Sequence, residues 1–99
     1  MNALQTYVVI VDEVLRPDAL GLVSKLRAAG FRTDYSLSPA KVGKQFQAAE
    51  ERGAQFALVI APEEWAAGQV KIKTLATREE SSCPRDAVID RLKSPLSAY

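Results

Sequence analysis

Acidic, aromatic and basic side chains stand close together in the stretch VIAPEEWAAGQVKIKTL, residues 59–75. Glu63 and Glu64 carry carboxylates that accept hydrogen bonds from N–H donors, such as those on the edge of a nucleobase. The indole ring of Trp65, the only tryptophan in the chain, offers a flat face on which a base could stack, a contact of about 1–3 kcal/mol. Lys71 could neutralise a phosphate. These residue types suit the binding of a ligand, provided that the surrounding elements bring them together.

Residues that usually carry catalysis are scarce in this sequence. The chain has no histidine and one cysteine, Cys83, so this thiol has no histidine to activate it and no second cysteine with which to hold a metal. The sequence also has no glycine-rich phosphate loop of the common spacings. We therefore predict no catalytic residue, no metal and no cofactor for this chain alone, and we interpret Cys83 as a small structural residue beside a strand end.

The composition is that of an ordinary globular domain. Of the 99 residues, 47% are hydrophobic and 25% are charged, and the formal net charge is +1. This charge excludes an overall basic field, so contact with nucleic acid would need a local patch. Three features predict a cytoplasmic location and no membrane partner. No apolar run approaches the roughly 20 residues that span a bilayer, the N-terminus lacks the features of a signal peptide, and one cysteine fits a reducing compartment.

Hydrophobic periodicity predicts strands that alternate with helices. The β-branched run at 7–11 is typical of a strand buried on both faces, and apolar residues then recur at helical spacing until Gly30. Ser38 and Pro39 have the residue types of an N-cap and a first helical position. The predicted strands are 7–11, 31–35, 55–61, 69–75 and 77–82, and the predicted helices are 18–29, 38–52 and 85–93, with a short turn or helical stub at 62–67.

The order of these elements predicts an α/β fold, specifically a three-layer α/β/α sandwich. Two successive strand–helix units indicate parallel strands joined by right-handed crossovers. The connection at 62–68 is too short for a parallel return, so the strand at 69–75 is expected to run antiparallel. In open sheets of this kind, ligands bind beyond the carboxyl ends of the parallel strands. Those ends release the loops 12–16, 36–38 and 62–67.

Basic residues flank the same predicted edge of the sheet. Arg16 follows the first strand, and Lys41 and Lys44 fall in the first turns of the second predicted helix, where backbone N–H groups also favour anions. We expect these three cations, together with Lys71, to contact phosphates, which position a nucleic acid without specifying its sequence.

An ordered set of short motifs lies in the run LRAAGFRTDYSLSPAKVGKQFQAAEERGAQFALVIAPEEWAAGQVKIKTLATREE. Its members are Leu26, Arg27, Ala28, Ala29, Gly30, Lys44, Gln45, Ala49, Gly53, Ala54, Glu64, Gly68 and Lys73. In their order and spacing, the chain resembles the C-terminal anticodon-binding domain of class IIa aminoacyl-tRNA synthetases, and most closely that of histidyl-tRNA synthetase. The resemblance covers most of the chain, from about Tyr7 to Glu80.

The resemblance implies a fold, a function and partners. It implies a five-stranded mixed sheet of order 2-1-3-4-5 with the fourth strand antiparallel, in a domain over 1–94 followed by a flexible tail at 95–99. It also implies binding to the anticodon stem-loop of histidine tRNA by a domain, or a stand-alone relative, of an aminoacyl-tRNA ligase. A synthetase catalytic domain would be the second partner. The expected tRNA-binding residues are Arg16, Lys41, Lys44, Glu63, Glu64, Trp65 and Lys71.

Structural alternatives stay open for these residues and for the chain. Trp65 can anchor a turn against the core, the two glutamates can charge the first turn of a helical stub, and the lysines can form a solvated face. We expect Lys73 to pack its stem and to pair with an acid. For the whole chain, a protein-interaction or dimerisation module on the same fold, forming a homodimer, is the alternative function. A nucleotide or small-molecule binder at the sheet edge is a weaker one.

Overall fold

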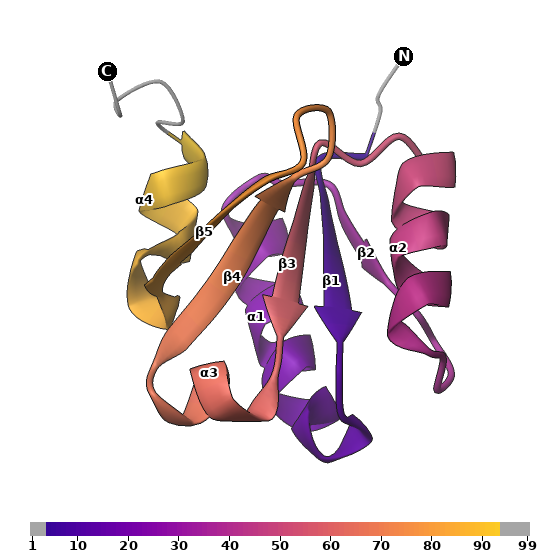
Figure 1. Cartoon of the computed structure of the whole chain (residues 1–99). Helices are drawn as coiled ribbons and strands as arrows, with labels where there is room; N and C mark the ends of the chain where they lie inside the picture. The colour runs from indigo at the N-terminus through magenta and orange to yellow at the C-terminus, as the bar shows by residue number, and fades with distance from the viewer. Residues whose placement is uncertain (1–3, 94–99) are drawn as a thin grey trace.

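A five-stranded mixed sheet forms the centre of the molecule (Figure 1). The structure, a computed structural model, describes residues 4–93 of the chain. β1 pairs in parallel with β2 and β3, whereas β4 pairs antiparallel with β3 and β5. The predicted strand order, β2-β1-β3-β4-β5, and the reversed fourth strand are confirmed. The strands are β1 Thr6–Ile10, β2 Thr33–Tyr35, β3 Phe56–Ile60, β4 Gln69–Thr74 and β5 Glu79–Pro84.

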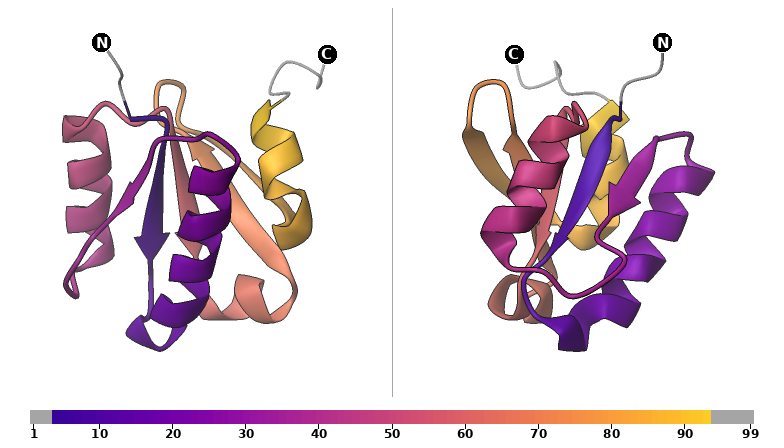
Figure 2. Two further views of the ribbon diagram at one scale, coloured as in Figure 1. Left: turned by 180° about the vertical axis from the view of Figure 1, so that it is seen from behind. Right: turned by 90° about the vertical axis from the view of Figure 1, so that its right-hand side faces the viewer.

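Helices cover the two faces of the sheet unequally (Figure 2). α1, Arg16–Ala28, and α4, Val88–Lys93, pack on one face, and α2, Val42–Glu51, packs on the other. Because side chains alternate along a strand, Val8 and Leu58 belong to the core under α1 and α4, while Tyr7 and Ala57 belong to the core under α2. The three-layer sandwich is therefore confirmed. Among residues 4–93, no helix covers β4 and β5 on the face that carries α2 (Figure 1).

The start of α2 differs from the sequence-based expectation. The predicted start at 38–39 is wrong, because the helix begins at Val42 and the backbone of Lys41 before it is extended. The buried side-chain amide of Gln45 determines the position of this helix. Its oxygen accepts from the Ile10 N–H and its nitrogen donates to the Ile10 carbonyl, each at 2.8 Å. The same nitrogen donates to the Ala40 carbonyl at 2.8 Å, which holds the preceding segment outside the helix.

The last strand lies later in the chain than the pattern at 77–82 predicted. β5 covers Glu79–Pro84, and residues before it form a turn in which the Arg78 N–H donates to the Thr74 carbonyl at 2.8 Å. This register places Cys83 opposite Val70 in the core, where it is fully buried, so its interpretation as a structural residue is confirmed. The predicted helix at 85–93 begins as a 3-10 turn, Arg85–Ala87, before α4.

The carboxyl ends of β1, β2 and β3 meet at one edge of the sheet, which we call the carboxyl edge (lower edge in Figure 1). A 3-10 turn, η1 Glu13–Leu15, and a short helix, α3 Pro62–Ala66, lie there. Gly68, with a φ of +75°, follows α3 at a backbone angle that suits glycine, and the chain then enters β4. The start of β1 and the end of α4 lie at the opposite edge (Figure 1).

Two further expectations concern membrane-spanning helices and the C-terminal boundary of the domain. Within residues 4–93, no helix is long and apolar enough to cross a membrane. The predicted tail at 95–99, and the domain boundary at 94, lie outside the described residues.

Candidate nucleic-acid interface

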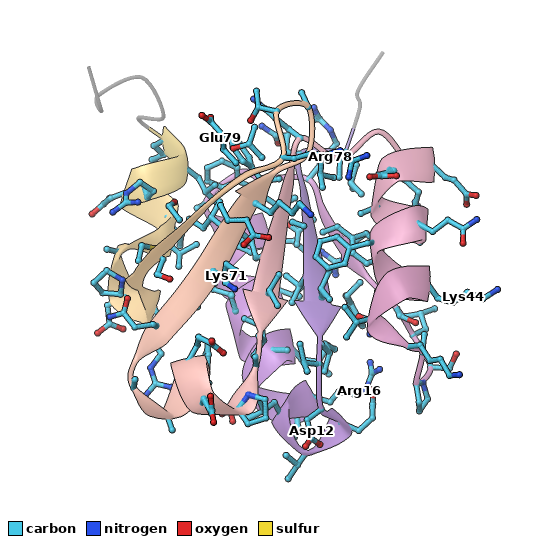
Figure 3. All side chains as sticks on the ribbon, in the orientation of Figure 1. Asp12, Arg16, Lys44, Lys71, Arg78 and Glu79 are labelled. Carbon is cyan, nitrogen blue, oxygen red and sulfur yellow. The ribbon has the colours of Figure 1, made fainter. Side chains whose placement is uncertain are left out.

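Arg16 holds two loops of the carboxyl edge together (Figure 3). Its guanidinium donates to both carboxylate oxygens of Glu13, at 2.6 and 3.0 Å, and to the carbonyl of Ser36 at 2.8 Å. The hydrogen bond from Arg16 lowers the pKa of Glu13 below its ordinary value, and the same bond raises the pKa of Arg16. Arg16 therefore lies at the carboxyl edge, as the sequence predicted, but its positive charge is partly neutralised by the ion pair with Glu13. The sequence analysis did not single out Glu13.

The two lysines of α2 are placed differently from each other. Lys41 immediately precedes the helix and lines a shallow hollow of about 300 Å³ at the carboxyl edge, together with Ile10, Val11 and Glu13. The side chain of Lys41, the N-cap residue, makes no capping hydrogen bond to the first turn of α2. Lys44 is exposed one turn further on and points away from the sheet (Figure 3). Of the two lysines, Lys41 is the one that shares a hollow with Glu13, the partner of Arg16.

α3 presents the acidic residues at the same edge. Glu63 is exposed and Glu64 is half-buried, and both lie in the first turn of the helix after Pro62. Acidic side chains at a helix N-terminus interact favourably with the helix dipole. Glu63 and Glu64 therefore stabilise α3 whether or not they also bind a ligand. Figure 1 shows α3 below β3 and β4, with the N-terminal end of α2 across the sheet from it.

Trp65 anchors α3 against the body of the domain. Its indole is half-buried and packs against the core under α1 and α4. The Arg85 guanidinium lies 4.5 Å from the ring centroid, a cation–π contact, and donates weakly to the Trp65 carbonyl at 3.5 Å. A pocket of about 380 Å³ adjoins the pair, bordered by Asp18 and Asp86 among others. The structure therefore shows the anchoring role, and base stacking on Trp65 stays a prediction.

Lys71 lies on the sheet rather than at its carboxyl edge (Figure 3). It belongs to a part of β4 and β5 beside α2, which we call the open face and define by Lys71, Lys73, Glu80 and Ser82. The Lys73 ammonium lies 5.0 Å from the Phe46 ring centroid and 3.9 Å from a Glu80 carboxylate oxygen. The expectation that Lys73 packs its stem and pairs with an acid is confirmed.

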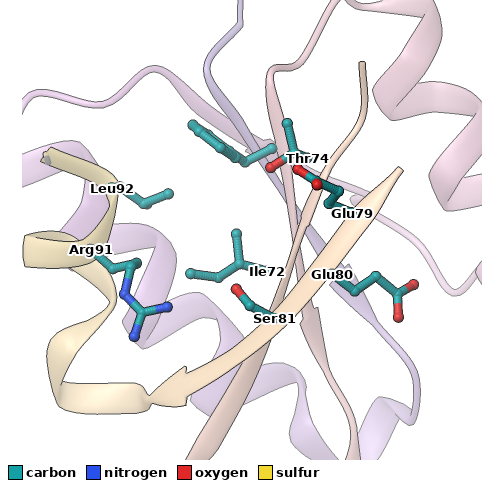
Figure 4. A pocket seen from close by; sticks show the side chains of 8 residues that line it. Ile72, Thr74, Glu79, Glu80, Ser81, Arg91 and Leu92 are labelled. Atoms are coloured by element: carbon teal, nitrogen blue, oxygen red, sulfur yellow. The ribbon is translucent and has the colours of Figure 1, made fainter. Parts of the chain in front are cut away.

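A larger pocket lies on the other face of the same strands, between β5 and α4 (Figure 4). It has a volume of about 480 Å³, and its floor contains Phe56 and Ile72. Arg91 points toward Ser81 across it (Figure 4). The sequence analysis did not predict this pocket, because it depends on the packing of α4 against β5.

Besides Glu13, two more charged residues beside the predicted site were missed. Arg85 follows a proline and lies far in sequence from Trp65, so no local pattern indicates their contact. Glu80 forms ion pairs with Lys71 and Lys73, and only the register of the β4–β5 hairpin places it between them. That register could have been inferred if the turn at 75–78 had been located.

Comparison with known proteins extends these observations. A family model described as the anticodon binding domain matches residues 5–94. The histidine–tRNA ligase of Opitutus terrae is 42% identical over 88 residues, which are 89% of this chain and 20% of that protein. The enzyme of Stenotrophomonas maltophilia is 33% identical over 95 residues, 96% of this chain and 20% of its own length. The chain thus spans about a fifth of the length of these relatives.

Solved structures show the same arrangement of elements. The histidyl-tRNA synthetase of a Nostoc species superposes with a TM-score of 0.86 at 29% identity, covering 96% of this chain and 23% of that one. The RNA binding domain of threonyl-tRNA synthetase from Cryptosporidium parvum shares the fold, with a TM-score of 0.83 at 21% identity over 92% of this chain and 23% of that one. This chain therefore belongs to the family of anticodon-binding domains, and its relatives are histidyl-tRNA synthetases.

Proposed function

We propose that this chain binds the anticodon stem-loop of histidine tRNA and contributes no catalytic residue of its own. The observation that supports this most strongly is the family match over residues 5–94, combined with the similarity of the chain to histidine–tRNA ligases. The gathering of basic and acidic side chains at the carboxyl edge and on the adjoining open face gives the proposal a physical basis.

Different residues serve different parts of the RNA in this proposal. Lys41, Lys44 and Lys71 contact phosphates, since exposed ammonium groups neutralise the backbone without reading its sequence. Arg16 adds charge at the edge and fixes the two loops that it joins. Glu63 and Glu64 accept hydrogen bonds from base N–H groups, and the exposed part of Trp65 stacks on an unpaired base, as is usual for single-stranded loops.

Binding of two stem-loops to the 99-residue chain tests the anticodon claim. One is the anticodon stem-loop of histidine tRNA, and the other has the same stem with a changed anticodon. Fluorescence anisotropy should show affinity at least tenfold higher for the first, because lost base contacts cost about 1–3 kcal/mol each. Equal affinity for the two stem-loops would contradict the proposal.

A substitution at α3 sharpens this experiment. Glu64→Gln keeps the size of the side chain but weakens its acceptance from base N–H groups, so the preference for the histidine anticodon should shrink by about fivefold or more. Glu50→Gln is the matched control, because Glu50 is exposed in the last turn of α2, away from the carboxyl edge. The control should keep the full preference.

We further propose that the chain acts in the cytoplasm beside the catalytic domain of a histidine–tRNA ligase. The support is that the chain spans only 20% of each of the two relatives compared above. An antibody against this chain should precipitate histidine-charging activity from the cytoplasmic fraction of a cell extract. A precipitate that contains the chain but no such activity would contradict this partnership.

A further inference from the structure

Glu80 lies between two lysines on the open face. One carboxylate oxygen is 3.7 Å from the Lys71 ammonium, and the other is 3.9 Å from the Lys73 ammonium. The hairpin register determines this arrangement, since Glu80 pairs directly with Lys73 while Lys71 pairs with Ser82. Lys71 and Lys73 stand two residues apart on β4, so both project from the same face. A single acid therefore neutralises part of the charge of two bases.

The three side chains remain accessible to solvent. Their exposed fractions are 38% for Lys71, 21% for Lys73 and 46% for Glu80. Exposed pairs of this kind are weak, at about 0.2–1 kcal/mol each, so a stronger anion can displace the carboxylate. A phosphate carries its charge on oxygens that the same ammonium groups can bind. It would approach across the open face, which α2 borders where the Phe46 ring centroid lies 5.0 Å from the Lys73 ammonium.

We propose that Glu80 is an internal competitor of RNA phosphate, a specificity-determining residue that screens Lys71 and Lys73 until a phosphate displaces it. This inference rests on the proposed function, because it needs RNA to reach the open face. With Glu80 in place, the three groups carry a net charge of +1 and behave as one cation toward RNA. Without the acid they behave as two cations, and the open face binds any RNA more strongly.

By screening Lys71 and Lys73, Glu80 weakens the contacts to RNA phosphates and leaves the contacts to bases unchanged. Phosphate contacts supply sequence-independent affinity, which grows with the number of cations that meet the backbone. By lowering that affinity, Glu80 makes stable binding depend on the base contacts at the carboxyl edge. The acid therefore limits adsorption to unrelated RNA without any contact to a base.

Glu80→Gln is the test, with Glu79→Gln as the matched control. Both substitutions remove one negative charge from β5. However, Glu79 pairs with Thr74 on the side of the β5–α4 pocket (Figure 4). Glu80 also borders that pocket, but its carboxylate forms ion pairs with Lys71 and Lys73 on the open face. Binding of both stem-loops is measured by anisotropy at several salt concentrations. Thermal unfolding of each variant verifies that the fold is retained.

For Glu80→Gln we expect affinity to rise by about threefold to tenfold for both stem-loops equally. The plot of log K against log salt should steepen by about 0.7, the contribution of one more neutralised phosphate on a single strand. Glu79→Gln should change neither quantity by a comparable amount. In a chain that also carries Lys71→Ala and Lys73→Ala, Glu80→Gln should give no gain.

Other outcomes overturn the inference in distinguishable ways. If Lys71→Ala weakens binding while Glu80→Gln leaves affinity and salt dependence unchanged, the competitor role is wrong and the proposed function stands. If Glu80→Gln weakens binding, or strengthens binding to the histidine anticodon alone, Glu80 contacts the RNA itself. Equal gains from Glu79→Gln would reduce the effect to overall charge. If the wild-type chain binds neither stem-loop, the proposed function fails, and the inference fails with it.

Discussion

The side-chain amide of Gln45 joins α2 to the sheet by binding main-chain groups of β1, which in the middle of a sheet would pair with a neighbouring strand. Its amide satisfies both the N–H and the carbonyl of Ile10, and the side chain is only 2% exposed. Buried main-chain groups that lose a partner pay a desolvation cost, so this one side chain matters more than its lack of charge indicates.

At this position, Gln45→Leu should lower the free energy of unfolding by about 2–4 kcal/mol, because it leaves two buried main-chain groups of Ile10 without partners. Urea denaturation followed by circular dichroism measures the change. Gln47→Leu is the control. Gln47 is exposed and its amide donates only to Glu51 at 3.3 Å, so its loss should cost no more than about 0.5 kcal/mol. Equal losses at the two positions would show that Gln45 does not hold α2.

The β4–β5 hairpin places the charged groups of the open face. Its turn requires Arg78 to adopt a φ of +64°, the only positive value among non-glycine residues within 4–93. Side chains with a Cβ are strained in that region. The hairpin that contains this turn brings Cys83 into the core opposite Val70 and Glu80 opposite Lys73.

Replacing the strained residue tests this view of the hairpin. Arg78→Gly should raise the free energy of unfolding by about 0.5–1 kcal/mol, since glycine adopts a positive φ without a steric penalty. Thermal unfolding would show this as a higher melting temperature. Ala76→Gly, in the same turn but without a positive φ, should lower the melting temperature, because there glycine adds only freedom to the unfolded chain. A loss of stability in both variants would mean that Arg78 contributes through contacts.

The single cysteine reports on the whole molecule. Cys83 is fully buried in the core that α1 and α4 cover, beside Val88 and Leu92. Burial raises the pKa of its thiol above the ordinary value of 9.0. The folded state therefore retains the thiol proton more tightly than the unfolded state. This contribution to stability is present below pH 9 and is lost as the pH rises through the folded-state pKa.

The chain should accordingly react with a thiol reagent such as DTNB at the rate at which its core opens. At pH 8 we expect the reaction to be at least 100-fold slower in buffer than in 6 M guanidinium chloride, because burial restricts access and suppresses the thiolate. Destabilisation by Gln45→Leu should accelerate it. A fast reaction of the wild-type chain in buffer would show that Cys83 is reached without global opening.

The sequence was more informative about strands and layers than about side-chain partners. Continuous apolar runs predicted β1 and β3, and the short connection after β3 predicted the reversal of β4. The start of α2 was missed because Ser38 and Pro39 have the residue types of a helix start, while the bonds of Gln45 are long-range and follow no local pattern. The partners of Trp65 and Lys71 were missed for the same reason, since both depend on where β5 falls in register.

The path of the chain through the sandwich has a mechanical consequence. The start of β1 and the end of α4 both lie at the edge opposite α3 (Figure 1). A further domain attached through either of these ends would lie at the edge opposite the carboxyl edge. The carboxyl edge, with Arg16, Lys41 and α3, would then remain accessible. A rigid stem-loop could reach it without a steric clash with the attached domain.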